Sequence, residues 1–105
     1  MKSVYPLRVK GDSMEPGLRA GALVVARPID PATALRVGDV VVARRPDRPG
    51  LEIIKRIHSI DAAGAIFLIA DNPVGSDSYD FGSVRPEDII ARVLWRYWPL
   101  PPRRV

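Results

Sequence analysis

Residues 38–59 read GDVVVARRPDRPGLEIIKRIHS, and this stretch indicates the fold class. Two runs rich in valine and isoleucine, Val40–Arg44 and Glu52–Ser59, are separated by residues that favour turns, such as Pro49-Gly50. The chain also contains 11 prolines, which disfavour long helices. Further short runs of the same strand-forming character, each bounded by turn residues, are Tyr5–Val9, Leu23–Arg27, Ile66–Ala70 and Ile89–Tyr97.

These strands predict a mainly β fold without a large inserted subdomain. We expect residues 1–105 to form a single compact, barrel-like domain, because small barrels leave few sheet edges exposed. Short helical turns are expected near Ser13 and over Pro86–Ile90. The tail Pro99–Val105 is expected to be irregular and basic.

Lys55 occupies an unusual place in its strand. Because side chains alternate along a strand, Ile53, Lys55 and Ile57 share one face, which the isoleucines mark as facing the core. Arg56 and His58 lie on the other face, where Arg56 should point into solvent and His58 should be a surface or packing residue. Alternatively, Lys55 lies at the rim of the barrel and its ammonium group reaches outward to water.

Near the start of the chain, Ser13 lies in a segment typical of an exposed turn, Gly11-Asp12-Ser13-Met14-Glu15-Pro16. Glycine allows the backbone to approach a substrate, and the Ser13 N–H could face a developing oxyanion. Burial lowers the pKa of a lysine from about 10.4, so a neutral Lys55 amine could accept the proton of Ser13. A serine in a turn is also common without any catalytic role.

Composition excludes several kinds of site. The chain has no cysteine and a single histidine, His58, which excludes disulfides, thiolate zinc sites and a cysteine nucleophile. We therefore expect no metal and no cofactor. Its apolar runs are shorter than the roughly 20 residues of a membrane-spanning helix, so we expect no integral membrane anchor and a cytoplasmic location.

Four short segments of the chain form an ordered set of motifs. They are Gly11-Asp12-Ser13-Met14-x-Pro16, Gly38-Asp39-Val40-Val41, Ile54-Lys55-Arg56, and Asp71-Asn72 followed by Ser76-Asp77-Ser78 and Phe81-Gly82. In this order they resemble the sequence boxes of the signal-peptidase clan, which includes the LexA-type repressor proteases. The resemblance implies a serine endopeptidase with a β-rich catalytic core, in which Ser13 is the nucleophile and Lys55 the general base. It also implies that the substrate pairs as an extended strand with the segments before Ser13 and Lys55.

The chain departs from the clan pattern in the final box. Tyr79 stands where the clan usually has an arginine, so the Asp–Arg pair of the clan cannot form in the same way. The spacing leaves Ser76 or Ser78 as the hydroxyl that orients Lys55, with Ser76 preferred. Gly11 occupies the position where some members have an oxyanion-binding hydroxyl, so backbone N–H groups must contribute more.

Within the clan, the segments Arg45–Gly50, Asp71-Asn72-Pro73 and Arg92–Pro99 resemble the nickel-type superoxide dismutase maturation proteases. That resemblance implies cleavage in trans of an extended peptide, the N-terminal extension of the nickel superoxide dismutase precursor. Only 12 residues precede Ser13 and 15 separate Lys55 from Asp71, which also favours a small protease acting in trans.

Two alternatives remain open. The first is a general signal-peptidase-like protease without an anchor of its own. The second is a non-enzymatic basic β-barrel, because the net charge is +4 and 13 arginines stand against three lysines. In that case nucleic acid would be bound by Arg44, Arg45, Arg48 and the aromatic residues of Trp95–Trp98. If the protein is a protease, we expect no nucleic-acid partner.

Overall fold

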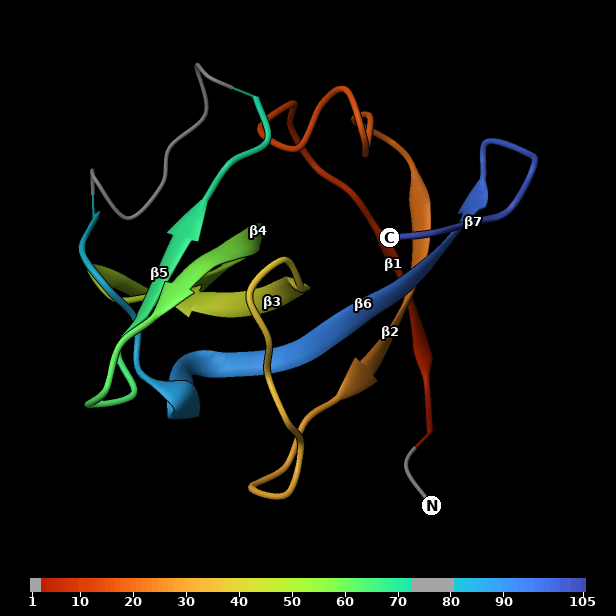
Figure 1. The fold of residues 1–105 in the computed structure, drawn as a ribbon. Helices are drawn as coiled ribbons and strands as arrows, with labels where there is room; N and C mark the ends of the chain where they lie inside the picture. The colour runs from red at the N-terminus through yellow and green to blue at the C-terminus, as the bar shows by residue number, and fades with distance from the viewer. Residues whose placement is uncertain (1–2, 73–80) are drawn as a thin grey trace.

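Seven strands form one antiparallel sheet in the computed structural model, which describes residues 3–72 and 81–105 (Figure 1). The strand order is β1-β2-β6-β3-β4-β5, and β7 pairs with β6 away from this path. The expectation of a mainly β fold is confirmed. The elements are β1 (Tyr5–Arg8), β2 (Leu23–Pro28), β3 (Val40–Arg45), β4 (Arg48–Ile60), β5 (Ile66–Ile69), the 3-10 turn η1 (Pro86–Asp88), β6 (Ile89–Trp98) and β7 (Arg103–Arg104).

Strand β3 separates two hydrophobic cores. Val40 and Val42 pack into one cluster, whereas Val41 and Ala43 pack into the other. All four side chains are buried, so this strand is covered on both faces. The continuous valine run seen in the sequence follows from this position, since a strand buried on both faces has no polar side to alternate with.

The sheet curls until strands that are not neighbours face one another. In the strand order, β2, β6 and β3 lie between β1 and β4. Even so, Leu7 of β1 and Ile54 of β4 pack against the same core cluster, and both strands line one cleft. This curvature confirms the barrel-like expectation and brings together segments far apart in the sequence.

One expectation about a break in the sheet was wrong. Pro49-Gly50 does not end a strand but lies within β4, and the turn between β3 and β4 falls at residues 46–47. Arg45 pairs with Arg48 across that turn, after an irregularity in the ladder. Pro46 and Pro49 both favour a turn, so local composition could not show which of the two positions ends the strand.

The end of the chain is also more regular than expected. Arg103–Arg104 forms the short strand β7, in which Arg104 pairs with Trp95 of β6. The N–H of Val105 donates a 3.1 Å hydrogen bond to the carbonyl of Leu94. These backbone bonds hold the basic tail against β6.

The two expected helical turns had different outcomes. A short 3-10 turn does form at Pro86–Asp88, where Asp88 accepts a 3.1 Å hydrogen bond from the N–H of Arg85. Near Ser13 the chain forms successive turns instead of a helix.

Candidate functional site

The turn that carries Ser13 follows β1 and is anchored by its own apolar side chains. Met14 and Leu18 are buried in the core cluster, and the N–H of Leu18 donates a 2.9 Å hydrogen bond to the Met14 carbonyl. Gly11 has a φ of 73°, a left-handed conformation that glycine adopts without strain. Ser13 itself is half-buried, and its neighbour Met14 is fixed in the core.

Asn72 ties this turn to the segment that follows β5. The Asn72 backbone N–H donates a 2.8 Å hydrogen bond to the carbonyl of Ser13. Its side-chain amide Nδ2 donates a second bond, of 3.0 Å, to the carbonyl of Asp12. Two successive carbonyls of the turn are thus held by one residue, which restricts how the Ser13 backbone can move.

Asp71 is held in turn by Arg56 of β4. Arg56 Nε and Nη2 donate to the two oxygens of Asp71, each at 2.9 Å, and Arg56 Nη1 donates to the Gly38 carbonyl at 2.8 Å. The hydrogen bond to Asp71 raises the pKa of Arg56, against the opposing effect of burial. A bidentate guanidinium–carboxylate pair fixes both position and orientation.

The expectation that Arg56 points into solvent was therefore wrong. Its side chain is one-third exposed, at 33%, and joins the segment containing Asp71 to β4. Strand alternation correctly put Arg56 on the face opposite Lys55. What it could not show is that Asp71, from a later part of the chain, covers that face. An Asp–Arg pair is thus present with partners other than those expected from the clan pattern.

Lys55 is buried in the middle of β4. Its residue exposure is 5%, and it is the one charged residue buried among those the structure describes. It pairs with Val41 of β3. Ile53 and Ile57, two residues away on either side in β4, pack in the core cluster that contains Val41. Lys55 is thus a core-facing lysine, and the alternative of a rim lysine reaching into water does not hold.

His58 lies on the other face of β4 and is exposed. Its ring packs edge-on against the ring of Phe67, with 6.0 Å between the two ring centres.

Ser13 and Lys55 line the same cleft, which has a volume of about 370 Å³. Its walls come from the end of β1, the turn after it, and residues 51–55 of β4. Apolar side chains, among them Leu7, Val9 and Met14, line the cleft together with the charged residues Arg8, Lys10 and Glu52. A hydroxyl and a buried amine in one partly apolar cleft form an arrangement that can support nucleophilic catalysis with an amine base.

The other residues expected at the site lie around this cleft. Met14 lines it, while Gly11, Asp12 and Pro16 belong to the same turn without lining the cleft. Asp71 and Asn72 lie outside the lining and support the turn through the bonds described above. Ser76, Asp77 and Ser78, expected to orient Lys55 or to complete the final box, lie outside the described residues, as does Tyr79.

Comparison with known proteins adds the family. The model of the family described as Peptidase S24-like matches residues 1–94. The chain belongs to this family. The matched region contains both Ser13 and Lys55.

A curated relative gives a more distant likeness. Mitochondrial inner membrane protease subunit 1 of Xenopus tropicalis is 29% identical over an alignment 111 residues long, and that alignment covers 86% of this chain. The match covers 66% of that relative's own length. Among the described residues of the present chain, no helix is long and apolar enough to cross a membrane.

Proposed function

We propose that this peptidase-family chain is a serine endopeptidase in which Ser13 is the nucleophile and Lys55 the general base. The observation that carries the proposal is that both residues line one cleft, with Lys55 buried at 5% exposure. Burial disfavours the charged form of an amine, which favours a lysine that can accept a proton. Membership of the Peptidase S24-like family supports peptide-bond hydrolysis as the activity.

The proposed reaction has two stages. The Ser13 hydroxyl attacks the carbonyl carbon of the substrate while its proton passes to the amine of Lys55. Lys55 then protonates the departing amine, which leaves an ester between Ser13 and the acyl part of the substrate. A water molecule then attacks this ester and gives a proton to Lys55. Lys55 passes that proton to the Ser13 oxygen as the bond between this oxygen and the acyl carbon breaks, which restores the Ser13 hydroxyl and releases the carboxylic acid.

The oxyanion of each tetrahedral intermediate needs hydrogen-bond donors that are already in place. We propose the Ser13 backbone N–H as one such donor, because Gly11 offers no side-chain hydroxyl nearby. The bonds from Asn72 to the Asp12 and Ser13 carbonyls hold the backbone on either side of this N–H. A fixed turn would keep the donor aimed without reorganisation during the reaction.

The edge of β4 suggests how a substrate would bind. The β4–β5 ladder begins at Arg56, so residues 51–54 have no β5 partner along the wall of the cleft. A peptide bound as an added strand would use these backbone groups for hydrogen bonds. This mode requires an extended segment, because a folded substrate has its own backbone groups already paired.

For the substrate we propose the N-terminal extension of a nickel superoxide dismutase precursor, cut in trans. The proposal rests on the resemblance of Arg45–Gly50, Asp71-Asn72-Pro73 and Arg92–Pro99 to maturation proteases of that enzyme. Chain termini are poorly ordered unless they are tied down, so such an extension could supply an extended segment. A general signal peptide is the competing substrate.

The test is to incubate the purified chain separately with the precursor and with a signal-peptide substrate, and to identify the products by mass spectrometry. We expect a single cut that releases the extension. The cut should be lost in Ser13→Ala and retained in Ser59→Ala, a matched control at an exposed serine of β4. Cleavage of the signal peptide alone would replace the proposed substrate, and full cleavage by Ser13→Ala would overturn the nucleophile.

A further inference from the structure

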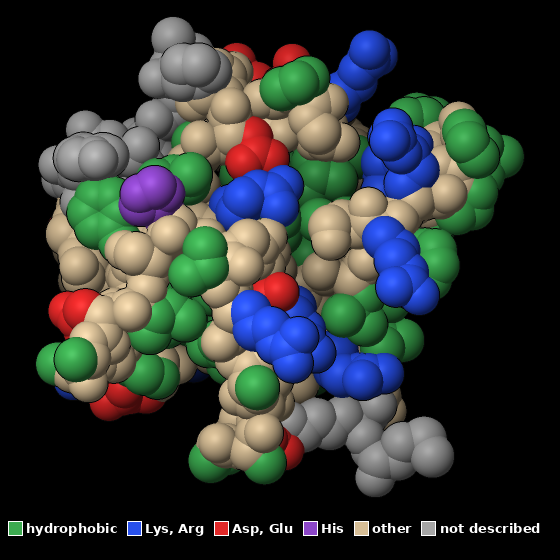
Figure 2. All heavy atoms as spheres, in the orientation of Figure 1, with side chains coloured by type: hydrophobic (Ala, Val, Ile, Leu, Met, Phe, Trp, Pro, Cys, Tyr) green, Lys and Arg blue, Asp and Glu red, His purple; other side chains and the backbone are tan. Residues whose placement is uncertain are grey.

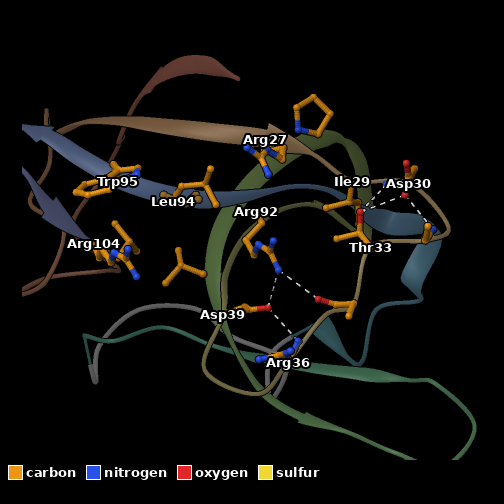
Figure 3. A pocket seen from close by; sticks show the side chains of 16 residues that line it. Arg27, Ile29, Asp30, Thr33, Arg36, Asp39, Arg92, Leu94, Trp95 and Arg104 are labelled. Carbon is orange, nitrogen blue, oxygen red and sulfur yellow. Dashed lines mark hydrogen bonds and ion pairs between the residues drawn. The ribbon is translucent and has the colours of Figure 1, made fainter. Parts of the chain in front are cut away.

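A second and larger hollow lies away from the catalytic cleft. Its volume is about 750 Å³, and it shares no lining residue with the cleft of Ser13 and Lys55. Four arginines from different elements line it: Arg27 from β2, Arg36 from the loop after β2, Arg92 from β6 and Arg104 from β7 (Figure 3). The site described above uses none of them.

Two of these guanidinium groups are available for a ligand. The side chains of Arg27 and Arg36 form no hydrogen bond or ion pair with any residue that the structure describes. Arg92 is engaged, since its Nη1 lies 3.8 Å from Asp39 Oδ2 and donates to the Ala34 carbonyl at 3.2 Å (Figure 3). The positive charge of the hollow is therefore only partly neutralised from within.

The carboxylates in the wall serve the loop itself. Asp30 Oδ1 accepts a 2.9 Å hydrogen bond from the N–H of Ala32. Asp39 Oδ2 accepts a 2.9 Å bond from the N–H of Arg36, in addition to its ion pair with Arg92. Both carboxylates thus shape residues 30–39, and the lining retains more guanidinium groups than carboxylates.

A smaller hollow of about 170 Å³ continues the arginine lining toward the nucleophile turn. Arg104 and Val105 line both hollows. The smaller one also contains Arg56, Arg96 and Arg103, together with Gly17 and Leu18. Gly17 and Leu18 directly follow the Ser13–Pro16 segment, so the arginine lining reaches the turn that carries Ser13. Figure 2 shows groups of Lys and Arg side chains across one face, with few Asp or Glu among them.

We propose that these two hollows form one track that binds an acidic, extended segment of a polypeptide. Guanidinium groups match carboxylates in a bidentate geometry, and several of them spaced along a track suit acidic side chains spaced along a strand. Since the track ends at the nucleophile turn, the segment is assigned to the substrate, as the part that lies outside the cleft. That assignment to substrate rests on the function proposed above.

The lining favours a peptide over a single-stranded nucleic acid. Proteins that bind single strands offer aromatic faces on which bases stack. Trp95 lines the larger hollow, but the guanidinium of Arg104 lies 5.6 Å from its ring centre and covers one face. Asp30 and Asp39 in the wall would also repel a continuous phosphate backbone, whereas a peptide can place uncharged residues beside them.

The first test measures binding by fluorescence anisotropy, with a labelled deca-glutamate peptide and a deca-glutamine peptide of equal length. We expect the full chain to bind the glutamate peptide selectively, and more weakly as NaCl rises from about 50 to about 200 mM. Arg27→Gln/Arg36→Gln should weaken binding about fivefold, as expected for two exposed pairs. Arg48→Gln/Arg85→Gln removes the same charge outside both hollows and should leave binding unchanged.

The track would be overturned if the two peptides bound equally well, or if Arg48→Gln/Arg85→Gln weakened glutamate-peptide binding as much as Arg27→Gln/Arg36→Gln. It would also be overturned if a ten-nucleotide oligothymidylate or phosphatidylserine vesicles bound more tightly than the glutamate peptide. Ser13→Ala should bind the glutamate peptide as the unchanged chain does, because Ser13 lines neither hollow. Glutamate binding by the unchanged chain, with no detectable proteolysis by that same chain, would keep the track and remove the peptidase assignment. Proteolysis without glutamate binding would remove the track alone. If both hold, adding glutamates to a cleavable peptide should lower KM and leave kcat unchanged.

Discussion

The backbone N–H of Asn72 donates a 2.8 Å hydrogen bond to the carbonyl of Ser13, and its side chain reaches the carbonyl of Asp12 at 3.0 Å. Asp71, the preceding residue, is clamped by Arg56 through two bonds of 2.9 Å. Arg56 directly follows Lys55 in β4. The strand that carries the proposed base therefore also supports, through Asp71 and Asn72, the turn that carries the proposed nucleophile.

Replacing Asn72 tests whether this support matters for catalysis. Asn72→Ala removes the bond to Asp12 and should lower kcat about tenfold, because small displacements of reacting groups are costly. KM should change little, and the free energy of unfolding should fall by about 1 kcal/mol. Peptide-cleavage kinetics and denaturant unfolding measure the two effects.

The control for Asn72 is Asp61, in the turn between β4 and β5. Its Oδ1 accepts 2.9 Å bonds from the N–H groups of Ala63 and Ala65. Asp61→Ala should therefore reduce stability without reducing kcat. If Asn72→Ala retained full kcat despite the same loss of stability, Asn72 would have no positioning role.

The pair of Arg56 and Asp71 should show energetic coupling. Arg56→Lys loses the bidentate geometry and should lower the free energy of unfolding by about 1 kcal/mol, since the pair is partly exposed. A double-mutant cycle with Asp71→Asn, followed by urea unfolding, measures the coupling directly. Arg45 pairs at 2.6 Å with Asp47, whose carboxylate is more exposed than that of Asp71, and this pair should show a smaller coupling. Equal coupling in both pairs would mean that Arg56 and Asp71 act as an ordinary surface pair.

Substitutions of Lys55 should separate catalysis from stability. Lys55→Met keeps the length of an apolar stem but removes the amine, so proteolysis should be lost. Burying a charged or polar group is costly, so the free energy of unfolding should rise by about 1 kcal/mol. Lys55→Arg should also be inactive, because a guanidinium stays protonated, and it should be less stable because the larger group overfills its site. Proteolysis by Lys55→Met at the rate of the unchanged chain would remove Lys55 as the base.

Tyr5 should produce a pH dependence of stability at alkaline pH. Burial, followed by repulsion from Glu52, raises the pKa of Tyr5 above its ordinary value of 10.0. The folded state therefore holds the phenol proton more tightly than the unfolded state. Its contribution to stability is complete below about pH 10 and is lost as the pH rises through the higher folded-state pKa.

Urea unfolding between about pH 8 and pH 11 measures this loss, and absorbance at 295 nm follows ionisation of the phenol. Tyr5→Phe should show a shallower alkaline decline. In Glu52→Gln the pKa of Tyr5 should move back toward its ordinary value. An identical decline in Tyr5→Phe and the unchanged chain would show that other groups cause it.

Much of the sheet could be predicted from the sequence because its signals are local. The expected runs Leu23–Arg27 and Val40–Arg44 differ from β2 and β3 by one residue at one end. The start of β4 was predicted less well, because Pro49-Gly50 has the composition of a turn yet lies inside the strand. Propensity describes a residue in isolation, whereas the ladder with β3 determines where β4 begins.

The sequence by itself determined the β-strands, the turn that carries Ser13 and the face of β4 on which Lys55 lies, because each depends on neighbours within a few residues. Only the tertiary structure decided that Arg56 holds Asp71, 15 residues away, and that Asn72 reaches Asp12, 60 residues away. It also brought arginines of β2, β6 and β7 around one hollow. Such contacts depend on how the strands pair and how far the sheet curls, and both depend on residues that lie far apart in the sequence.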